Sequence, residues 1–333
     1  MNPIDTIISI HLNYDYFKYV FASCENNIII LEKTEGTKTN ESDDKFINKL
    51  YSLLSGSSLK VKNVFDKFAP SVPVVDSEFD VGDIITINYF NLVECAFYKD
   101  ILVYNKEYTG KYMNWYDTGI VQLDCMYKNG KLDGKYYEYY PNGNPKIECT
   151  YDNNKLNGPY SSWHDNSNML IQSNYINGLL NGKFIKYNYF GSNEIVCEYI
   201  DNKLNGEYCE YYDSLNDRER CTYKDGEIDG LYYKFYDQPN KKYIKCVYEN
   251  GLRHGHFFQW FENGNKKIMC MYTNGELNGP YFKWHKNGND AIKCEYTDGK
   301  LNGKYIELHK NGYIMSNYTY IDGKIDTRPL NSI

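Results

Sequence analysis

The sequence predicts a mainly β fold, an elongated antiparallel sheet of stacked 24-residue β-hairpins preceded by a small α+β region. Two observations predict this class. A glycine followed two positions later by an aromatic residue recurs at intervals of 24 residues, with one interval of 25. Within each unit, short stretches alternate apolar and polar residues between Asn-Gly or Asp-Gly steps. Such self-similarity fixes the architecture before individual elements are assigned. The recurring glycines are Gly110, Gly134, Gly158, Gly182, Gly206, Gly230, Gly255, Gly279 and Gly303.

Each unit contains two expected strands. In the second, Ile147, Cys149 and Tyr151 stand at alternate positions, which predicts a strand with one buried face. The first strand carries two aromatic residues three positions apart, so a regular strand places them on opposite faces. Either both faces carry an aromatic row, or a bulge near the turn rotates one of them. The candidate binding-surface and packing residues are Tyr112, Trp115, Tyr136, Tyr139, Tyr160, Trp163, Tyr208, Tyr211, Trp260 and Trp284.

The connections between expected strands have the composition of tight turns. Asn-Gly and Asp-Gly supply the positive φ angles that two-residue hairpin loops need. Each unit is therefore expected to be a β-hairpin that joins its neighbours in antiparallel fashion. An isolated two-stranded hairpin is only marginally stable in water, so the units must stack to bury their aromatic side chains.

Residues 1–104 lack the repeat and are predicted to form an α+β capping region. The expected role is to cover the apolar end of the first repeat; the alternative is a separate binding site. Residues 105–326 form the repeat array and residues 327–333 a tail. Ile101 and Val103 are interpreted as a degenerate half-repeat. Strands are expected at 4–11, 28–33, 83–90 and 94–104, helices at 43–54 and 61–68, and a loop at 69–73.

Composition and charge narrow the class of protein. The chain has 333 residues, 37 of them Tyr, and a net charge of −7. Residues 1–104 carry 9 Lys and Arg against 15 Asp and Glu, so the array is nearly neutral. An array without a basic stripe argues against nucleic-acid binding, which needs clustered cations. No apolar run is long enough for a transmembrane segment. Residues 1–12 lack the features of a secretory signal, which predicts an intracellular, cytoplasmic protein with reduced cysteines.

No constellation of residues predicts catalysis, a metal or a cofactor. Equivalent cysteines of successive hairpins lie about 10 Å apart in such a sheet, too far to share a zinc ion or a disulfide. They are interpreted as small buried hydrophobes, although Cys197 and Cys209 flank one turn and could face each other. His164, His285 and His309 share a repeat position with Tyr, which indicates a packing or surface position rather than a set of metal ligands. We therefore expect a protein that is not an enzyme.

The recurring Gly-x-Tyr-x-x-Trp/Tyr pattern with closing Gly-x-Leu-Asn-Gly resembles MORN-type repeats in their variant form. Residues 251–256, Gly-Leu-Arg-His-Gly-His, come closest to the standard signature. The resemblance covers Tyr108 to Asp326 and includes antitoxin-like bacterial proteins and proteins of giant amoebal viruses. It implies a hairpin array that serves as a binding or scaffolding surface, without catalytic residues. For a viral protein it implies the host cytoplasm or the virion.

These observations predict a non-enzymatic scaffold that presents an extended aromatic sheet surface to a protein partner. The first alternative is an antitoxin-like neutraliser of a toxin enzyme. The second is an enzyme whose chemistry lies in residues 1–104. Peripheral lipid contact, suggested by the family, is weakened by the missing basic face, and the unpaired strands at the ends of an open sheet leave self-association open.

Overall fold

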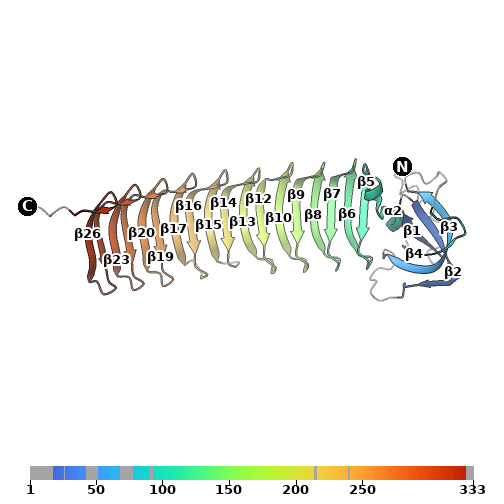
Figure 1. The fold of residues 1–333 in the computed structure, drawn as a ribbon, viewed down its shortest axis with the longest axis horizontal. Helices are drawn as coiled ribbons and strands as arrows, with labels where there is room; N and C mark the ends of the chain where they lie inside the picture. The colour runs from blue at the N-terminus through green and yellow to red at the C-terminus, as the bar shows by residue number, and fades with distance from the viewer. Residues whose placement is uncertain are drawn as a thin grey trace, which may run out of the picture. The chain divides into compact units, whose positions relative to one another are not determined.

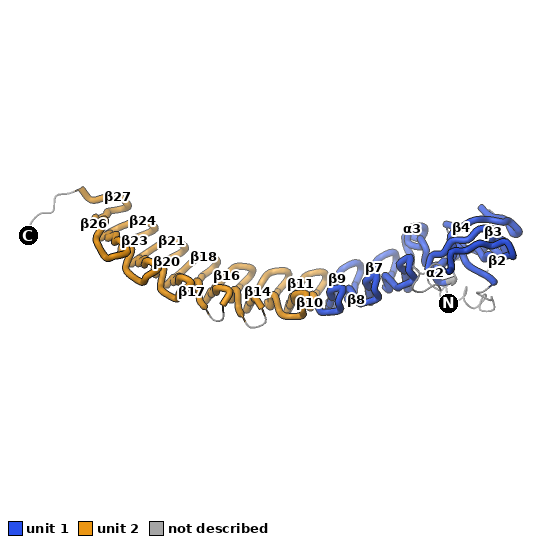
Figure 2. The backbone as a smooth tube through the Cα atoms, turned by 90° about the horizontal axis from the view of Figure 1, so that it is seen from below, with its two compact units in different colours: residues 1–169 blue, residues 170–333 orange. Residues whose placement is uncertain are grey.

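The computed structural model describes residues 18–25, 27–42, 52–67, 78–90, 93–213, 216–238 and 241–327. The chain divides into two compact units, Met1–Met169 and Leu170–Ile333, which Figure 2 colours separately. Among the described residues, the first unit contains a small N-terminal sheet, two short helices and the first hairpins. The second unit is built from hairpins throughout its described residues.

The N-terminal sheet is antiparallel, in the order β1-β2-β3-β4. Strand β2 begins with a continuous apolar run because the strand is buried on both faces of the sheet at that end. Ile29 and Leu31 belong to a cluster on one face of the sheet. Ile28 and Ile30 belong to a cluster on the other face, which includes the helices that follow. The elements are β1 (Tyr19–Cys24), β2 (Asn27–Thr39), β3 (Leu54–Asp66), β4 (Ile84–Tyr89), α2 (Val93–Tyr98) and α3 (Ile101–Tyr104).

Two assignments in this region were wrong. Residues 61–66 are strand rather than helix and pair with β2, where Val61 lies opposite Leu31 and Phe65 opposite Ile28. A register shift between these pairs directs Val61 and Phe65 to opposite buried faces of the sheet. Residues 94–104 are α2 and α3 rather than a strand, and the half-repeat at Ile101 does not exist. Cys95 to Tyr98 are all buried, so this segment shows no alternation that separates strand from helix.

The strands predicted at 28–33 and 83–90 are confirmed as β2 and β4. The predicted helix at 43–54 cannot extend to Leu54, which begins β3. The remainder of that helix up to residue 51, the strand at 4–11 and the loop at 69–73 lie outside the described residues.

The repeats fold as the periodicity predicts, into consecutive antiparallel hairpins (Figure 1). The first unit continues with β5 (Gly110–Trp115), β6 (Val121–Lys128), β7 (Lys131–Tyr139), β8 (Pro145–Asp152) and β9 (Lys155–Trp163). The second unit contains β10 (Met169–Ile176), β11 (Leu179–Leu180), β12 (Gly182–Tyr187), β13 (Asn193–Ile200), β14 (Lys203–Tyr211), β15 (Asp217–Lys224), β16 (Glu227–Phe235), β17 (Lys242–Glu249), β18 (Leu252–Arg253), β19 (Gly255–Trp260), β20 (Lys266–Thr273), β21 (Glu276–Leu277), β22 (Gly279–Trp284), β23 (Asp290–Thr297), β24 (Lys300–Leu301), β25 (Gly303–Leu308), β26 (Ile314–Ile321) and β27 (Lys324–Ile325).

Two kinds of turn join the strands. Between β6 and β7, Asn129 and Gly130 form a two-residue loop in which both φ angles are positive, 49° and 70°. That combination belongs to the turn whose twist matches paired strands. Between β7 and β8, the Gly143 amide donates to the Tyr140 carbonyl at 2.8 Å, and Gly143 has a φ of 86°. Asn154 and Asn202 replace the glycine of the first kind of turn and keep φ at 66°, a conformation that asparagine tolerates.

Candidate interaction surfaces

The strand register assigns each aromatic row to a face. Tyr136 lies directly opposite Cys149, and directly opposite residues share a face of the sheet. The face that carries the cysteines also carries the lead aromatic of each unit, and we call it the cysteine face. Its lead aromatics are Tyr112, Tyr136, Tyr160, Phe184, Tyr208, Tyr232, Phe257, Tyr281 and Tyr305.

On the cysteine face, each lead aromatic packs edge-to-face against the closing tyrosine of its own unit. The ring centroids of Tyr136 and Tyr151 are 5.4 Å apart, and those of Tyr208 and Tyr223 are 5.6 Å apart. Both distances and the steep interplanar angles lie in the range that aromatic pairs prefer. These rings cover the buried cysteine side chains. The cysteine face is therefore the packed side of a sheet that has few other packing partners.

The second aromatic of each unit lies on the opposite face, which we call the tryptophan face. Phe258 and Trp260 stack with ring centroids 5.8 Å apart, and Phe282 and Trp284 at 6.0 Å. Residues two apart on a strand project to the same face, and Phe258 follows the lead aromatic Phe257 directly. Both faces therefore carry an aromatic row, the first of the two alternatives. The register does shift beside each second aromatic, as at Trp260, but the shift does not rotate it onto the cysteine face.

The ten candidate residues divide between these faces. Tyr112, Tyr136, Tyr160 and Tyr208 lie on the cysteine face. Trp115, Tyr139, Trp163, Tyr211, Trp260 and Trp284 lie on the tryptophan face, by the alternation within their strands. The candidates therefore do not form a single surface, and a binding role for either set stays a prediction.

Most of the cysteines are buried packing residues, whereas Cys24 and Cys209 are only partly buried. All ten are free thiols. Burial raises the pKa of the Cys149 and Cys270 thiols to about 11 and that of Cys221 to about 12. Since the thiolate is the reactive form, these thiols are poor nucleophiles. Cys197 and Cys209 do not face each other: Cys197 lies opposite Tyr208, so its neighbour Cys209 projects to the other face.

A ladder of side-chain hydrogen bonds links successive units at their mid-unit turns. The Tyr140 hydroxyl donates to the Trp163 carbonyl at 2.8 Å, and the Tyr236 hydroxyl to the Trp260 carbonyl at 3.0 Å. His285 occupies the same repeat position, and its Nε2 lies 2.8 Å from the Leu308 carbonyl. Tyr and His interchange here because both donate to the next unit. The sequence shows this interchange but not the partner atom.

Asparagines of the same turns form a second ladder. The Nδ2 atoms of Asn263 and Asn265 both donate to the Lys286 carbonyl, at 2.8 and 3.0 Å. Asn287 and Asn289 repeat this arrangement one unit later, on the Lys310 carbonyl. The Asn-Gly-Asn sequence at these turns therefore connects units as well as reversing the chain.

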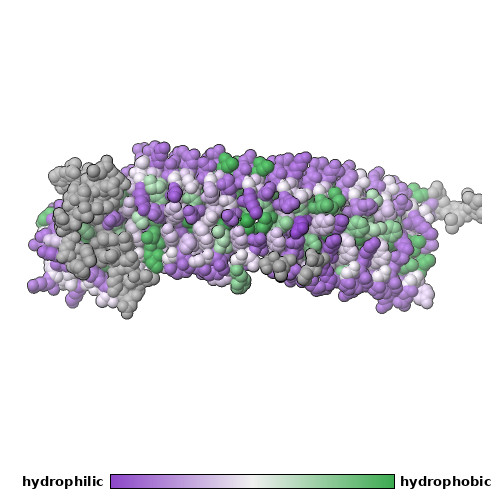
Figure 3. Space-filling view, turned by 180° about the vertical axis from the view of Figure 1, so that it is seen from behind, coloured by the Kyte–Doolittle hydropathy of each residue, from purple (hydrophilic) through white to green (hydrophobic). Residues whose placement is uncertain are grey.

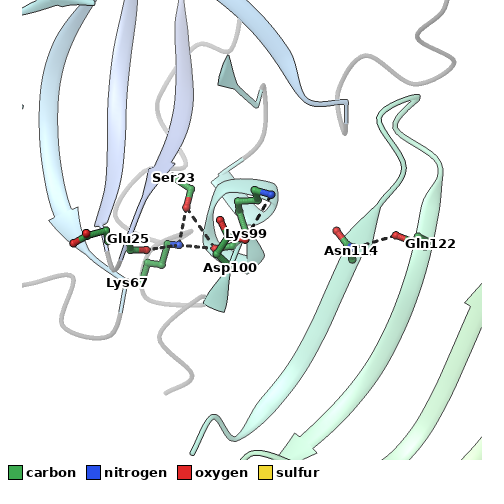
Figure 4. A network of polar contacts seen from close by, with 7 residues as sticks. All are labelled: Ser23, Glu25, Lys67, Lys99, Asp100, Asn114 and Gln122. Atoms are coloured by element: carbon green, nitrogen blue, oxygen red, sulfur yellow. Dashed lines mark hydrogen bonds and ion pairs between the residues drawn. The ribbon is translucent and has the colours of Figure 1, made fainter. Parts of the chain in front are cut away.

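Helix α2 covers the outer edge of the first hairpin. The Tyr98 ring lies 6.0 Å from that of Tyr112 and 6.2 Å from that of Trp115, measured between centroids. A buried lysine fixes the end of this helix: Lys67 Nζ donates to Ser23 Oγ at 2.7 Å and to the Lys99 carbonyl at 2.7 Å (Figure 4). Burial lowers the pKa of Lys67 to about 8. Its partners are uncharged acceptors, which indicates a structural role.

Cavities in the first unit are modest. One of about 310 Å³ is lined by Asn40, Leu53, Asn88 and Asp117 among others, and Asp117 is its ionisable side chain. Another, of about 230 Å³, lies beside Tyr137 and Ser161, where the serine stands in a row that carries larger residues in other units. Within the described residues, no three His, Cys, Asp or Glu side chains converge as metal ligands would. Among the described residues, no helix has the length and apolar character needed to cross a membrane.

The family model described as MORN repeat variant matches residues 132–153 and 253–274. Each match covers the closing loop, the lead aromatic and the Cys-x-Tyr strand of a hairpin. These two hairpins of the chain are therefore similar to MORN repeats of the variant type. Other hairpins of the array share their register, with a lead aromatic opposite the cysteine row.

Further comparisons add little. No curated protein matches the chain. Among solved structures, one match is the "Crystal Structure of TcdB2-TccC3", at 8% identity and a TM-score of 0.19. It covers 90% of this chain, whereas this chain spans 17% of that one. A likeness at this TM-score carries no argument about fold or function.

One row was missed by the sequence analysis. In four of the repeats, the residue that follows the lead aromatic is itself aromatic and lies on the tryptophan face. These residues are Tyr137, Tyr233, Phe258 and Phe282. These rings stack beside the second aromatics and widen the apolar surface. The signal was present, because adjacent aromatics in a strand point to opposite faces. In the view of Figure 3, hydrophilic residues line the two long edges and paler and apolar residues lie between them.

Proposed function

We propose that this protein is a non-enzymatic scaffold that presents an aromatic sheet surface to a protein partner. The observation that carries the proposal is the tryptophan face. In the second unit, contacts between the described elements run between neighbouring strands, without a second layer over the rings. Extended, half-exposed aromatic surfaces are typical of interaction sites. MORN repeats are consistent with a scaffold or interaction protein.

The proposal assigns a role to each part of the chain. Residues 1–104 form a cap, residues 105–326 the binding array and residues 327–333 a tail. We also propose an intracellular location, supported by ten free cysteines, which are typical of a reducing compartment. The acidic net charge and the nearly neutral array support a protein partner over nucleic acid or lipid.

The test is capture of the partner by the tagged full chain from its native cell, followed by mass spectrometry and light scattering of the complex. A single protein enriched at fixed stoichiometry is the expected result. The double variant Trp260→Ser/Trp284→Ser should lose that partner. The control is Tyr313→Ser, at a position beside the Gly312 turn where the side chain is 75% exposed.

The other outcomes are equally informative. The captured partner could instead be a toxin-like enzyme that the protein inhibits in a stoichiometric complex. That result would support the antitoxin-like alternative over the scaffold. A monomer that captures nothing, or a partner retained equally by the tryptophan-face variant, would contradict the proposal. An enzymatic activity that is abolished by substitutions in residues 1–104 would support the enzyme alternative.

A further inference from the structure

The residue before each cysteine changes charge along the chain. Before the cysteines of the cysteine face it is Asp124 and Glu148 in the first unit. In the second unit it is Arg220, Lys245 and Lys293 at three positions and the uncharged Val196 and Met269 at the other two. Because these residues adjoin the cysteines within a strand, they lie on the tryptophan face. The tryptophan face of the second unit is therefore basic along its centre, although residues 170–333 contain 21 Lys and Arg and 21 Asp and Glu.

Aromatic rings flank the central lysine of this row on both sides. Lys245 lies opposite Tyr233 on β16 and opposite Phe258 on β19. The Lys245 Nζ atom is 5.6 Å from the Tyr233 ring centroid, and the Lys242 Nζ atom is 5.9 Å from it. The Lys266 Nζ atom is 5.8 Å from the Trp284 ring. These are cation–π distances.

We define the basic–aromatic patch by the residues on β16 to β22 that share this face. The three lysines of the patch differ from the basic residues on either side of it. Arg220 and Lys293 already bind Asp217 and Asp290, at 2.7 and 2.6 Å. Within the part of the chain that the structure describes, the three patch lysines form no ion pair with a carboxylate. The patch consists of Tyr233, Phe235, Lys242, Lys245, Phe258, Trp260, Lys266, Phe282 and Trp284.

We propose that the basic–aromatic patch binds an extended acidic segment of a protein partner, whose carboxylates pair with Lys242, Lys245 and Lys266 while its apolar side chains pack on the rings. This inference rests on the proposed function and identifies the face and the chemistry of the partner. Carboxylates complement lysines that lack ion-pair partners, and the surrounding rings exclude water from such pairs.

The sheet geometry sets the spacing of the acidic residues. Because of the register shifts beside them, Lys242 on β17 and Lys266 on β20 lie opposite the second aromatics Phe235 and Trp260. These two lysines occupy equivalent positions two strands apart, about 10 Å at the usual strand separation. An extended chain crossing the strands rises about 3.3 Å per residue, so matching carboxylates stand about three residues apart. Single-stranded nucleic acid also combines negative charge with stacking bases. The balanced overall charge of this unit favours the protein segment.

The test is selection of displayed random dodecapeptides on the immobilised full chain, followed by anisotropy measurements on the enriched peptides. The expected peptides carry apolar residues and carboxylates about three positions apart. The variant Lys242→Glu/Lys245→Glu/Lys266→Glu should weaken them by about 10-fold or more. The charge-matched control is Lys224→Glu/Lys286→Glu/Lys310→Glu, at exposed positions of the same unit, and should stay within about 2-fold.

Several results would overturn the inference. Enriched peptides without carboxylates, or equal weakening by both variants, would show that the patch is not an acid-binding surface. If oligothymidylate displaces the peptides and binds the chain with higher affinity than they do, the ligand of the patch is nucleic acid instead. If the patch variant fails to fold, the affinity of the wild-type chain should still fall as sodium chloride rises, and a salt-independent affinity would contradict the proposal.

The same experiment separates this inference from the proposed function. Peptides that bind the patch variant normally but are lost on Trp260→Ser/Trp284→Ser leave the aromatic scaffold intact and remove the acidic specificity. Failure to enrich any peptide, together with an empty capture from the native cell, would remove both.

Discussion

Gly130 shows how one repeat position acquires a special role at the start of the hairpins. Its amide donates to the Tyr108 carbonyl at 2.9 Å, so the segment that enters the first hairpin passes directly over this turn. A Cβ atom at Gly130 would lie 1.7 Å from the Lys106 carbonyl oxygen. The equivalent Gly226 has space, since its nearest neighbour would be Lys203 Cβ at 3.8 Å.

We therefore predict that Gly130→Ala destabilises the protein more than Gly226→Ala. Both variants place a side chain on a residue with a positive φ angle, which lowers the free energy of unfolding by about 1 kcal/mol. Gly130→Ala must in addition displace main-chain atoms, and we expect it to lose at least about 2 kcal/mol more. Urea unfolding followed by circular dichroism measures the difference. Equal losses would show that the entering segment moves aside freely.

The turn ladder leads to a second prediction. Tyr140→Phe should lower the free energy of unfolding by about 1 kcal/mol, because it removes one hydrogen bond and leaves the Trp163 carbonyl without this donor. The control is Tyr313→Phe, at the largely exposed position, where a change within about 0.5 kcal/mol is expected. Thermal melts of the two variants compare them, and matching shifts would mean that the ladder adds no stability.

At the scale of elements, each lead aromatic is supported by the strands on both sides of it. Tyr208 lies opposite Cys197 on β13 and opposite Cys221 on β15, and its ring contacts Tyr223. Tyr305 lies opposite Tyr318, which is exposed in the last long strand described. Packing on a hairpin therefore depends on the presence of both neighbours, as expected for a quasi-linear repeat.

Tyr208→Ala should accordingly cost about 3 kcal/mol or more, the usual cost of removing a large packed side chain. Tyr305→Ala should cost less, because its surroundings are already partly open to solvent. Urea melts monitored by tyrosine fluorescence provide the comparison. Equal losses would contradict a sheet in which each unit depends on its immediate neighbours.

At the scale of the whole molecule, the many half-buried tyrosines and buried cysteines link stability to alkaline pH. Burial raises the pKa of Cys197 from 9.0 to about 11 and that of Tyr223 from 10.0 to about 12. The unfolded chain therefore loses these protons at lower pH than the folded chain does. The folded state binds more protons in this window, so its stability must fall as pH rises.

We predict that the free energy of unfolding declines from about pH 9 upward, through the raised pKa values of the folded thiols and phenols. Below pH 9 the contribution of these groups is complete. Urea melts at pH 7.5, 9 and 10.5 test this, with Cys221→Ala/Cys270→Ala as the matched variant. That variant should decline less steeply between pH 9 and 10.5, and a constant stability of the wild type over this range would refute the linkage.

The sequence determined the repeats because their information is local. The glycine period, the Asn-Gly turns and the Ile-Cys-Tyr alternation each specify a backbone conformation within a few residues, and neighbouring units reinforce it. The same alternation identified the cysteine face, and substitution of His for Tyr at one position indicated packing. Recurrence at nine positions made these signals stronger than any single strand could provide.

Only the tertiary structure decided the rest. Residues 94–104 became helix because they are enclosed between the N-terminal sheet and the first hairpin, and burial on all sides removes the periodicity that separates helix from strand. Residues 61–66 became strand because β2 supplies a partner along this stretch, while β4 pairs with the earlier part of β3, up to Lys60. The division of the candidate aromatics between two faces also required the tertiary structure, as did the basic row that contains Lys245. Strand register decides which residues of different strands share a face.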